Sequence, residues 1–236
     1  LGSAYYSKGE FDEAIQYHNE SLAMYRTIHG NHPYPNIASP LMNLGSSYCQ
    51  KGDHTECLQY YTQSLIILKQ IHGDQPHPDI AGILSNIGVV CRNTGDNERA
   101  LQYYTESLTM KRHIFGDQPH PDIASTLGNI GNVCIDTGDN ERALQYYKES
   151  LTMQRQIYGN QPHPDIASTL QNIGNVYINT HKYADALKNL YEARNMYKKI
   201  HGYNPHPDFQ KTLRAINATE QLLTRCIFIM FSSMHT

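Results

Sequence analysis

The chain has 236 residues, of which 17% are charged, and a formal net charge of -3. Because this balance is nearly neutral, it offers no electrostatic footprint for a nucleic-acid backbone or an anionic membrane surface, so no nucleic acid and no membrane is expected as a partner. The longest apolar run, residues 226–231, is far shorter than the roughly 20 residues that a membrane-spanning helix needs.

The cysteines bear on the compartment. There are five of them, and no two are spaced as a CxxC pair; they are Cys49, Cys57, Cys91, Cys134 and Cys226. This usage favours free thiols in a reducing, cytoplasmic compartment over a disulfide framework. The chain begins without Met inside a predicted helix, so we interpret it as a fragment.

The sequence repeats itself every 43 residues. Glycines recur at this spacing, and so do histidines inside the motif Gln/Asn-Pro-His-Pro-Asp; they are Gly30, Gly73, Gly116, Gly159 and Gly202, and His77, His120, His163 and His206. The units that start at Ile80 and Ile123 are identical at about three quarters of their positions. A period in this range predicts stacked supersecondary units rather than a globule.

Each unit is predicted to hold two helices, and the unit from Asp122 shows the first of them clearly. Asp122 follows a proline and precedes an apolar-periodic run, so it is the expected N-cap of a helix over residues 122–136. Leu127, Ile130 and Cys134 recur at a spacing of three to four residues and are expected to form the buried stripe of this helix.

The four residues after this helix are expected to break it. Gly138 suits a left-handed C-cap, and Asp139 or Asn140 suits the N-cap of a second helix over residues 141–158. The second helix has an apolar face wide enough to contact both its own partner and the next repeat. A glycine and a proline-rich loop are expected to end it.

Glycine also recurs in the middle of four first helices, at Gly45, Gly88, Gly131 and Gly174. An interior glycine costs about 1 kcal/mol relative to alanine, so its repetition favours a packing role. We expect the two helices of a pair to approach closely, with the small residue Ala143 opposite Gly131, and Ala100 and Ala186 in the same place in sister units.

These positions carry a resemblance to a known family. Signature residues of tetratricopeptide repeats are matched by Leu127, Ile130, Gly131, Cys134 (Tyr48 and Tyr177 in sister units), Gly138, Ala143 and Tyr147. The long period and the His-Pro-Asp-Ile-Ala opening resemble the kinesin light chain subgroup, which adds an extended loop to the usual unit of about 34 residues. The resemblance covers residues 1–225. It implies an all-α, right-handed α-solenoid of helix-turn-helix repeats that binds proteins and is not an enzyme.

The register sets the expected units. They are a truncated first repeat at 1–30, full repeats at 36–73, 79–116, 122–159 and 165–202, a terminal capping helix at 208–225 and a tail at 226–236. The tail contains the segment CIFIMF, which does not match the repeat. It is either the apolar end of the last helix or an artefact at the end of the sequence.

Residues that could act in catalysis or bind a metal recur with the repeat, which argues against a catalytic or metal site. Successive His-Pro-Asp triplets are expected to lie one repeat apart, on the order of 10–20 Å, whereas the histidine ligands of one zinc lie about 2 Å from it. We interpret these triplets as capped loops, and not as metal ligands or as the tripeptide of a J-domain. Cys91 and Cys134 are interpreted as core thiols, and the tyrosine pairs as packing residues rather than base-stacking ones. No cofactor is expected.

A polar stripe on the first helices is the candidate partner site. In tetratricopeptide repeats this side lines the concave groove, and amide side chains can hydrogen-bond the backbone of an extended peptide. Asparagine is a poor helix former, so its recurrence favours a groove over an ordinary solvated face. The candidate residues are Asn43, Asn86, Arg92, Asn93, Ser125, Asn129, Asn132, Asp136, Ser168, Gln171, Asn172, Asn175 and Asn179.

The charge of this stripe bears on its partners. Arg92 is the only basic residue within 36–50, 79–93, 122–136 and 165–179, so acidic C-terminal peptides of the Hsp70/Hsp90 type are disfavoured. We expect other proteins or peptides as partners. Two alternatives stay open: a kinesin light chain fragment that acts as cargo adaptor of a microtubule motor, and a sensor region of a larger enzyme or NTPase.

Overall fold

The structure, a computed structural model, describes residues 1–30, 34–73, 75–116, 118–159, 161–202 and 206–233. Within these residues the chain forms eleven α-helices and no strand, which confirms the all-α prediction. The chain divides into two compact units, residues 1–117 and residues 118–236, which we call unit 1 and unit 2.

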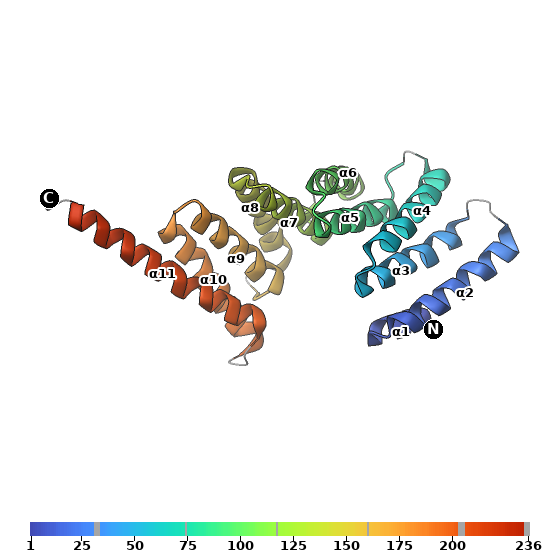
Figure 1. The fold of residues 1–236 in the computed structure, drawn as a ribbon. Coiled ribbons are helices and arrows are strands. Elements are labelled where there is room, and N and C mark those ends of the chain that lie inside the picture. Colours follow the sequence, from blue (N-terminus) through green and yellow to red (C-terminus); the bar gives the residue numbers. More distant parts are fainter. Residues whose placement is uncertain (31–33, 74, 117, 160, 203–205, 234–236) are drawn as a thin grey trace. The chain divides into compact units, whose positions relative to one another are not determined.

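Unit 1 consists of helix pairs that follow one another along the chain (Figure 1). Its helices are α1 (Gly2–Lys8), α2 (Phe11–His29), α3 (Pro35–Lys51), α4 (His54–His72), α5 (Pro78–Asn93) and α6 (Asn97–Phe115). The pairs are α1 with α2, α3 with α4 and α5 with α6, and neighbouring pairs meet through α2 with α3 and α4 with α5. We call α1, α3 and α5 first helices, and their partners second helices.

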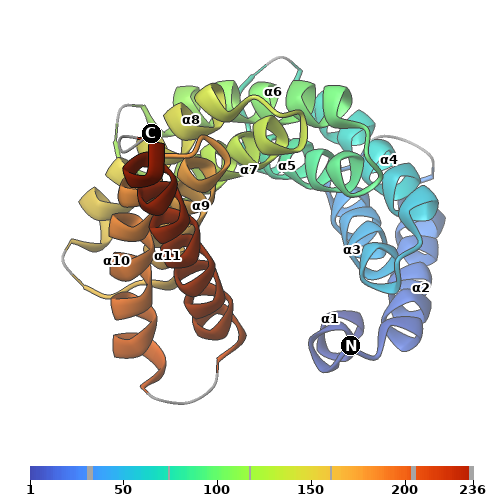
Figure 2. The same cartoon turned by 60° about the vertical axis from the view of Figure 1, so that its left-hand side comes forward.

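Unit 2 repeats this arrangement. Its helices are α7 (Pro121–Asp136), α8 (Asn140–Tyr158), α9 (Pro164–Asn179), α10 (Tyr183–His201) and α11 (Pro207–Ser233). Here α7 pairs with α8 and α9 with α10, while α11 packs on α10 and also touches α9, so it takes the place of a further first helix. Figure 2 shows α9, α10 and α11 side by side.

The start of α7 differs from the prediction. His120, not Asp122, is the N-cap: its φ of -134° is extended, as favoured before a proline, and its Nδ1 accepts the backbone N–H of Asp122 at 3.2 Å. Pro121 takes the first helical position. The break after α7 is as predicted, because Gly138 has a left-handed φ of 80° and Asp139 caps α8 by accepting a backbone N–H at 3.0 Å.

The predicted buried stripe of α7 is confirmed. Leu127, Ile130 and Cys134 are at most 2% exposed. Cys91 takes the same place in α5 and is 1% exposed. Burial raises the pKa of both thiols, which keeps them protonated, so these two cysteines are apolar core residues.

The mid-helix glycines lie against side chains of the paired second helix. A β-carbon at Gly131 would stand 2.7 Å from Cε1 of Tyr147, and one at Gly88 would stand 2.8 Å from Cε1 of Tyr104. The predicted close approach is therefore confirmed, but the expected partner Ala143 is wrong. Tyr147, one turn further along α8, covers the glycine, and Ala143 is buried beside that contact with no exposed surface.

One pair of cysteines contradicts the expectation of free thiols. Cys49 and Cys57 form a disulfide that joins the end of α3 to the start of α4. The tight turn between two antiparallel helices brings their α-carbons, eight residues apart in sequence, to 5.2 Å, a spacing that a search for CxxC pairs overlooks. Cysteine usage therefore no longer argues for a reducing compartment.

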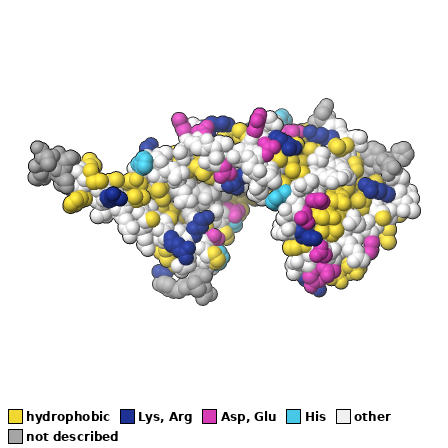
Figure 3. Space-filling model, viewed as in Figure 1, with side chains coloured by type: hydrophobic (Ala, Val, Ile, Leu, Met, Phe, Trp, Pro, Cys, Tyr) yellow, Lys and Arg dark blue, Asp and Glu magenta, His cyan; other side chains and the backbone are white. Residues whose placement is uncertain are grey.

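The last helix is longer than predicted. α11 continues to Ser233, so residues 226–233, assigned to a tail, are helical. Ile227, Phe228, Ile229 and Met230 are 45 to 72% exposed there, and Figure 3 shows apolar surface at this end of α11. Among the helices of the described residues, none is both long and apolar enough to span a membrane.

Candidate functional site

An asparagine stands at the same place on four successive first helices. The four are Asn43 on α3, Asn86 on α5, Asn129 on α7 and Asn172 on α9; Asn86 is exposed and the other three are half-buried. Each of these asparagines directly precedes a buried residue that packs its helix against the paired second helix. Its own side chain therefore lies at the edge of the core. Within the described residues, none of these four amides forms a side-chain hydrogen bond.

In unit 1, Asn43 lines an open pocket of about 500 Å³ between α1, α2 and α3. The other polar lining includes Ser3, Tyr17 and Ser21, together with the ring of His18. Burial lowers the pKa of His18, so its imidazole is uncharged at neutral pH. The pocket therefore offers neutral donors and acceptors beside one acidic side chain, that of Glu20.

The remaining candidates of unit 1 lie on α5. Asn93 is exposed at the last position of the helix, and Arg92 is half-buried beside it. One turn before them, Val89 takes the place that an asparagine holds in unit 2, and this valine is 39% exposed. The polar stripe is thus interrupted by an apolar side chain on α5.

In unit 2, the two asparagines one turn along from Asn129 and Asn172 differ in their surroundings. Oδ1 of Asn132 accepts the hydroxyl of Tyr147 at 2.6 Å, so half of this amide is engaged within the chain. On α9, Leu190 takes the place of that tyrosine, and within the described residues the side chain of Asn175 makes no hydrogen bond. Asn175 is therefore the more available of the two for a partner.

Gln171 is a correction to the predicted site. It is 5% exposed, and its Oε1 accepts the hydroxyl of Thr212 at 2.7 Å, which ties α9 to α11. The amide of Gln171 therefore stabilises the packing of helices within unit 2 and does not face a partner. The other candidates of this unit, Ser125, Asp136, Ser168 and Asn179, are exposed, and Asn179 donates to Oδ1 of Asn140 at 3.4 Å.

Two basic residues were missed because α11 was interpreted only as a cap. Lys211 and Arg214 follow Ser168 and Gln171 by one period, and both are exposed. Since α11 packs on α10 as α9 packs on α8, we assign these side chains to the same face from their register. The 43-residue register, extended one step further, would have found them.

The His-Pro-Asp triplets have structural roles. The ring of His163 stacks on Tyr158 at 3.5 Å, and its Nδ1 accepts the backbone N–H of Asp165 at 3.2 Å. His206 stacks on His201 in the same way, at 3.8 Å. Across the described residues, no three side chains of His, Cys, Asp or Glu come together in a group that could hold a metal ion.

Stacked helix pairs with a polar face on their first helices define an α-solenoid of the kind that serves protein–protein interaction. Tetratricopeptide repeat family models match residues 36–113 and 122–199, and residues 1–34. The chain belongs to the tetratricopeptide repeat family. No catalytic family is indicated, and no curated protein matches the chain.

Solved structures share this fold. BtubC (BKLC) from P. vanneervenii is 23% identical, with a TM-score of 0.76 over 88% of this chain and 81% of that chain. A putative kinesin light chain from Podospora anserina, with nearly identical TPR-like repeats, is 14% identical, with a TM-score of 0.71 over 86% and 94%. A Rap protein complexed with Competence and Sporulation Factor is 14% identical, with a TM-score of 0.68 over 95% and 62%.

Proposed function

We propose that this chain is an interaction scaffold whose first-helix face binds an extended segment of a partner protein. The observation that carries the proposal is the asparagine at one place on α3, α5, α7 and α9. A side chain that recurs with the repeat, lies at the edge of the core and has no hydrogen-bond partner in the described chain is available to an external one.

The chemistry of the face favours a peptide backbone as the ligand. Each amide offers two donors and one acceptor oxygen, which match the carbonyl and N–H groups of an extended strand. Neighbouring repeats lie on the order of 10–20 Å apart, and an extended chain advances about 3.3–3.6 Å per residue. Within either unit, successive asparagines would therefore contact the segment at intervals of a few residues.

The charge of the face favours a segment that is neutral over most of its length. On α3, α5, α7 and α9 the only basic residues are Arg92 and Lys51, the last residue of α3, which supports the exclusion of acidic C-terminal peptides. Lys211 and Arg214 are the exception at the α11 end of unit 2. A single acidic residue of the partner is best accommodated there.

Two narrower roles would use the same face. One is cargo binding for a microtubule motor, and the other is partner sensing by a larger enzyme or NTPase. Identification of the bound partner would distinguish these two roles, because a motor cargo and an enzyme regulator are different proteins. The Rap protein that shares this fold was determined in a complex with a factor, which supports partner binding by such repeats in general.

The test is selection of random peptides displayed on phage, with the chain immobilised as bait. Peptides enriched on the wild type should bind more weakly to the double variant Asn129→Ala and Asn172→Ala. The matched control is Gln145→Ala with Gln156→Ala, two exposed amides on second helix α8. Equal losses in both variants, or no loss in either, would move binding away from the first-helix face.

A further inference from the structure

α1 is shorter than the other first helices. It has seven residues, whereas α3 has 17 and α5, α7 and α9 have 16 each. In the 43-residue register Gly2 corresponds to Gly45, so α1 matches only the second half of α3. Its partner α2 has the full 19 residues of a second helix. The C-terminal half of α2 therefore lacks the first-helix turns that cover the same half of α4, α6 and α8.

The open pocket between α1, α2 and α3 lies along this uncovered half of α2. It has a volume of about 500 Å³, and Ser21 and Met24 are among the residues that line it. Met24 is 65% exposed, so the pocket is accessible to an external ligand. One repeat later, Ile67 holds the position of Met24 and packs against the core cluster that contains Ile37 and Leu41, in the first turns of α3. The pocket thus occupies the place that these turns fill in the next pair.

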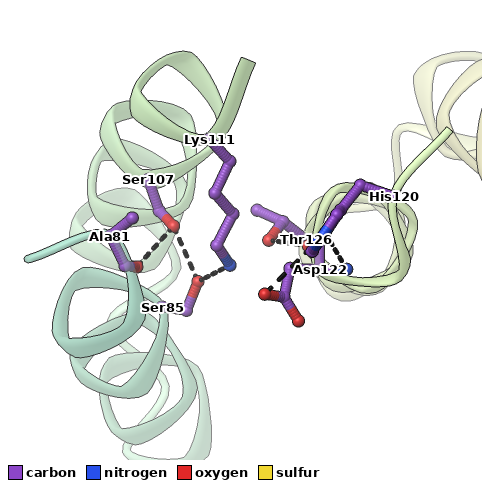
Figure 4. A network of polar contacts seen from close by, with 7 residues as sticks. All are labelled: Ala81, Ser85, Ser107, Lys111, His120, Asp122 and Thr126. Carbon is purple, nitrogen blue, oxygen red and sulfur yellow. Dashed lines mark hydrogen bonds and ion pairs between the residues drawn. The ribbon is translucent and has the colours of Figure 1, made fainter. Parts of the chain in front are cut away.

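A serine on the second helices shows how the first turns are held there. In three pairs the hydroxyl of this serine donates to the backbone carbonyl of an alanine near the start of the first helix. The bonds run from Ser64 to Ala38 at 2.9 Å, from Ser107 to Ala81 at 2.7 Å (Figure 4) and from Ser150 to Ala124 at 2.7 Å. All three serines are fully buried.

Ser21 is the serine of α2 at this position, and among the described residues nothing accepts its proton. It stands one period before Ser64, is half-buried and lines the pocket. His18, one turn earlier, lines the pocket too; it is 6% exposed and forms no hydrogen bond within the described chain. Buried polar groups are rarely left without partners in native structures. The pocket therefore holds two polar side chains that a ligand can satisfy.

The first helices share the residues that meet this part of a second helix. α3, α5, α7 and α9 all open with the pattern Ile-Ala-x-x-Leu, and the three named residues of the pattern are at most 3% exposed in each. The alanine carbonyl reaches the serine, while isoleucine and leucine supply apolar contact. A helical segment of this pattern therefore has the groups that the uncovered half of α2 meets elsewhere as buried partners.

We propose that this pocket binds a short helix of a partner protein that carries the pattern Ile-Ala-x-x-Leu. The alanine of the helix presents its carbonyl to the hydroxyl of Ser21, and the two aliphatic side chains cover Met24. Glu20 is the only charged side chain of the lining, so a neutral or basic helix is favoured over an acidic one. The inference goes beyond the proposed function, because the ligand is a helix and α2 makes the contacts that select it.

The direct test uses the acetylated and amidated peptide PNIASTLQN, which copies residues 164–172 with Asn in place of Asp165. Titration into the chain labelled with 13C-methyl methionine should shift the Met24 signal saturably and leave Met110 of α6 unshifted. A control peptide with serine in place of isoleucine and leucine should shift neither. Binding is expected to be weak, because so short a peptide is mostly unfolded in water.

Two serine variants form a matched pair. Ser21→Ala should weaken peptide binding roughly three- to ten-fold, the loss expected for one hydrogen bond. It should leave the melting temperature of the free chain unchanged. Ser150→Ala removes the bond to Ala124, so it should lower the melting temperature and leave the affinity for the peptide unchanged. Equal affinities of wild type and Ser21→Ala would overturn the assigned contact.

A lactam between the first and fifth peptide residues tests the helical form of the ligand. These positions copy Pro164 and Ser168, which are exposed in α9. The lactam holds the peptide in its bound conformation and should tighten binding several-fold. Weaker binding of the lactam peptide would show that the ligand is not a helix. The double variant Asn129→Ala with Asn172→Ala should bind it as the wild type does, so failure of the proposed function leaves this result intact.

Fusion of the same nine residues to Leu1 decides the case in which the free peptide binds too weakly to measure. The fusion extends α1 into the pocket and should raise the melting temperature and shift the Met24 signal, while a fusion of the serine control peptide should do neither. No difference between the two fusions would overturn the proposal. So would a Met24 signal that shifts with chain concentration in the absence of peptide, because a second copy would then fill the pocket.

Discussion

The ring of Tyr147 lies against Gly131, with its Cε1 2.7 Å from the place of a β-carbon, and its hydroxyl donates to Asn132 at 2.6 Å. One side chain of α8 thus closes the helix pair and positions an amide of the first-helix face. Tyr61 and Tyr104 cover Gly45 and Gly88 in the same way. Packing and the candidate site are therefore coupled in the pair of α7 and α8.

The first prediction contrasts the two interior glycines of α7. Gly131→Ala should overpack the contact with Tyr147 and lower the free energy of unfolding by roughly 1–3 kcal/mol. Gly128→Ala meets open space and should raise it by up to about 1 kcal/mol through helix propensity. Thermal unfolding of both variants checks this. Shifts of the same sign would contradict the assignment of different roles to the two glycines.

The second prediction concerns two asparagines of unit 2. Asn175→Ala should weaken peptide binding by about 0.5–1.5 kcal/mol per lost hydrogen bond and leave stability nearly unchanged. Asn132→Ala should also lower stability, because the hydroxyl of Tyr147 loses its acceptor. Calorimetric affinity and thermal unfolding, measured on the same preparations, separate the two effects. An unchanged affinity for Asn175→Ala would place the binding face elsewhere.

The third prediction concerns salt. Binding should change little between low and high ionic strength, because few charges on the face are available for screening. Any residual dependence should vanish in the double variant Lys211→Ala and Arg214→Ala, which removes the two basic residues of α11 that lie on this face. A steep dependence that survives this variant would indicate a charge-driven mode, with Arg92 as the next residue to change.

The fourth prediction concerns pH. Burial lowers the pKa of His18 below its ordinary value of 6.5, so below that pH the unfolded chain takes up a proton that the folded chain does not. Stability should therefore fall as pH drops through 6.5, and this contribution should level off below the folded pKa. His18→Tyr introduces the residue that Tyr61 provides one repeat later, and its unfolding midpoint should depend less on pH. The exposed control His113→Tyr should keep the wild-type slope.

The fifth prediction concerns the disulfide. Reduction of the bond between Cys49 and Cys57 should destabilise unit 1 by about 2–3 kcal/mol, as expected for the closure of a short loop. Cys57→Ala, which installs the residue of sister repeats, should make the unfolding midpoint insensitive to dithiothreitol. A wild-type midpoint that is equally insensitive would show that this cross-link does not contribute to stability.

The sequence determined the features that depend on local order. The 43-residue register located the helix pairs, the stripe of Leu127, Ile130 and Cys134 located the buried side of α7, and Gly138 with Asp139 located the turn. These follow from helix periodicity and from capping chemistry, which act over a few residues. The repeats then supported one another, because a wrong helix or turn assignment in one unit would have conflicted with the same positions in the others.

Tertiary structure decided which side chains meet. Ala143 and Tyr147 lie one turn apart on the same side of α8, and only the rotation of α8 against α7 selects Tyr147 as the residue over Gly131. Gln171 reaches Thr212, 41 residues away, and the antiparallel turn brings Cys49 to Cys57. The register placed Gly128 and Gln154 in sequence, but only the packed pair shows that a β-carbon at Gly128 would meet just Oγ of Ser150, at 4.0 Å, and that Oε1 of Gln154 on α8 is buried without a hydrogen-bond partner among the described residues. Such contacts depend on rotation and separation of helices to within an ångström, which hydrophobic periodicity does not encode.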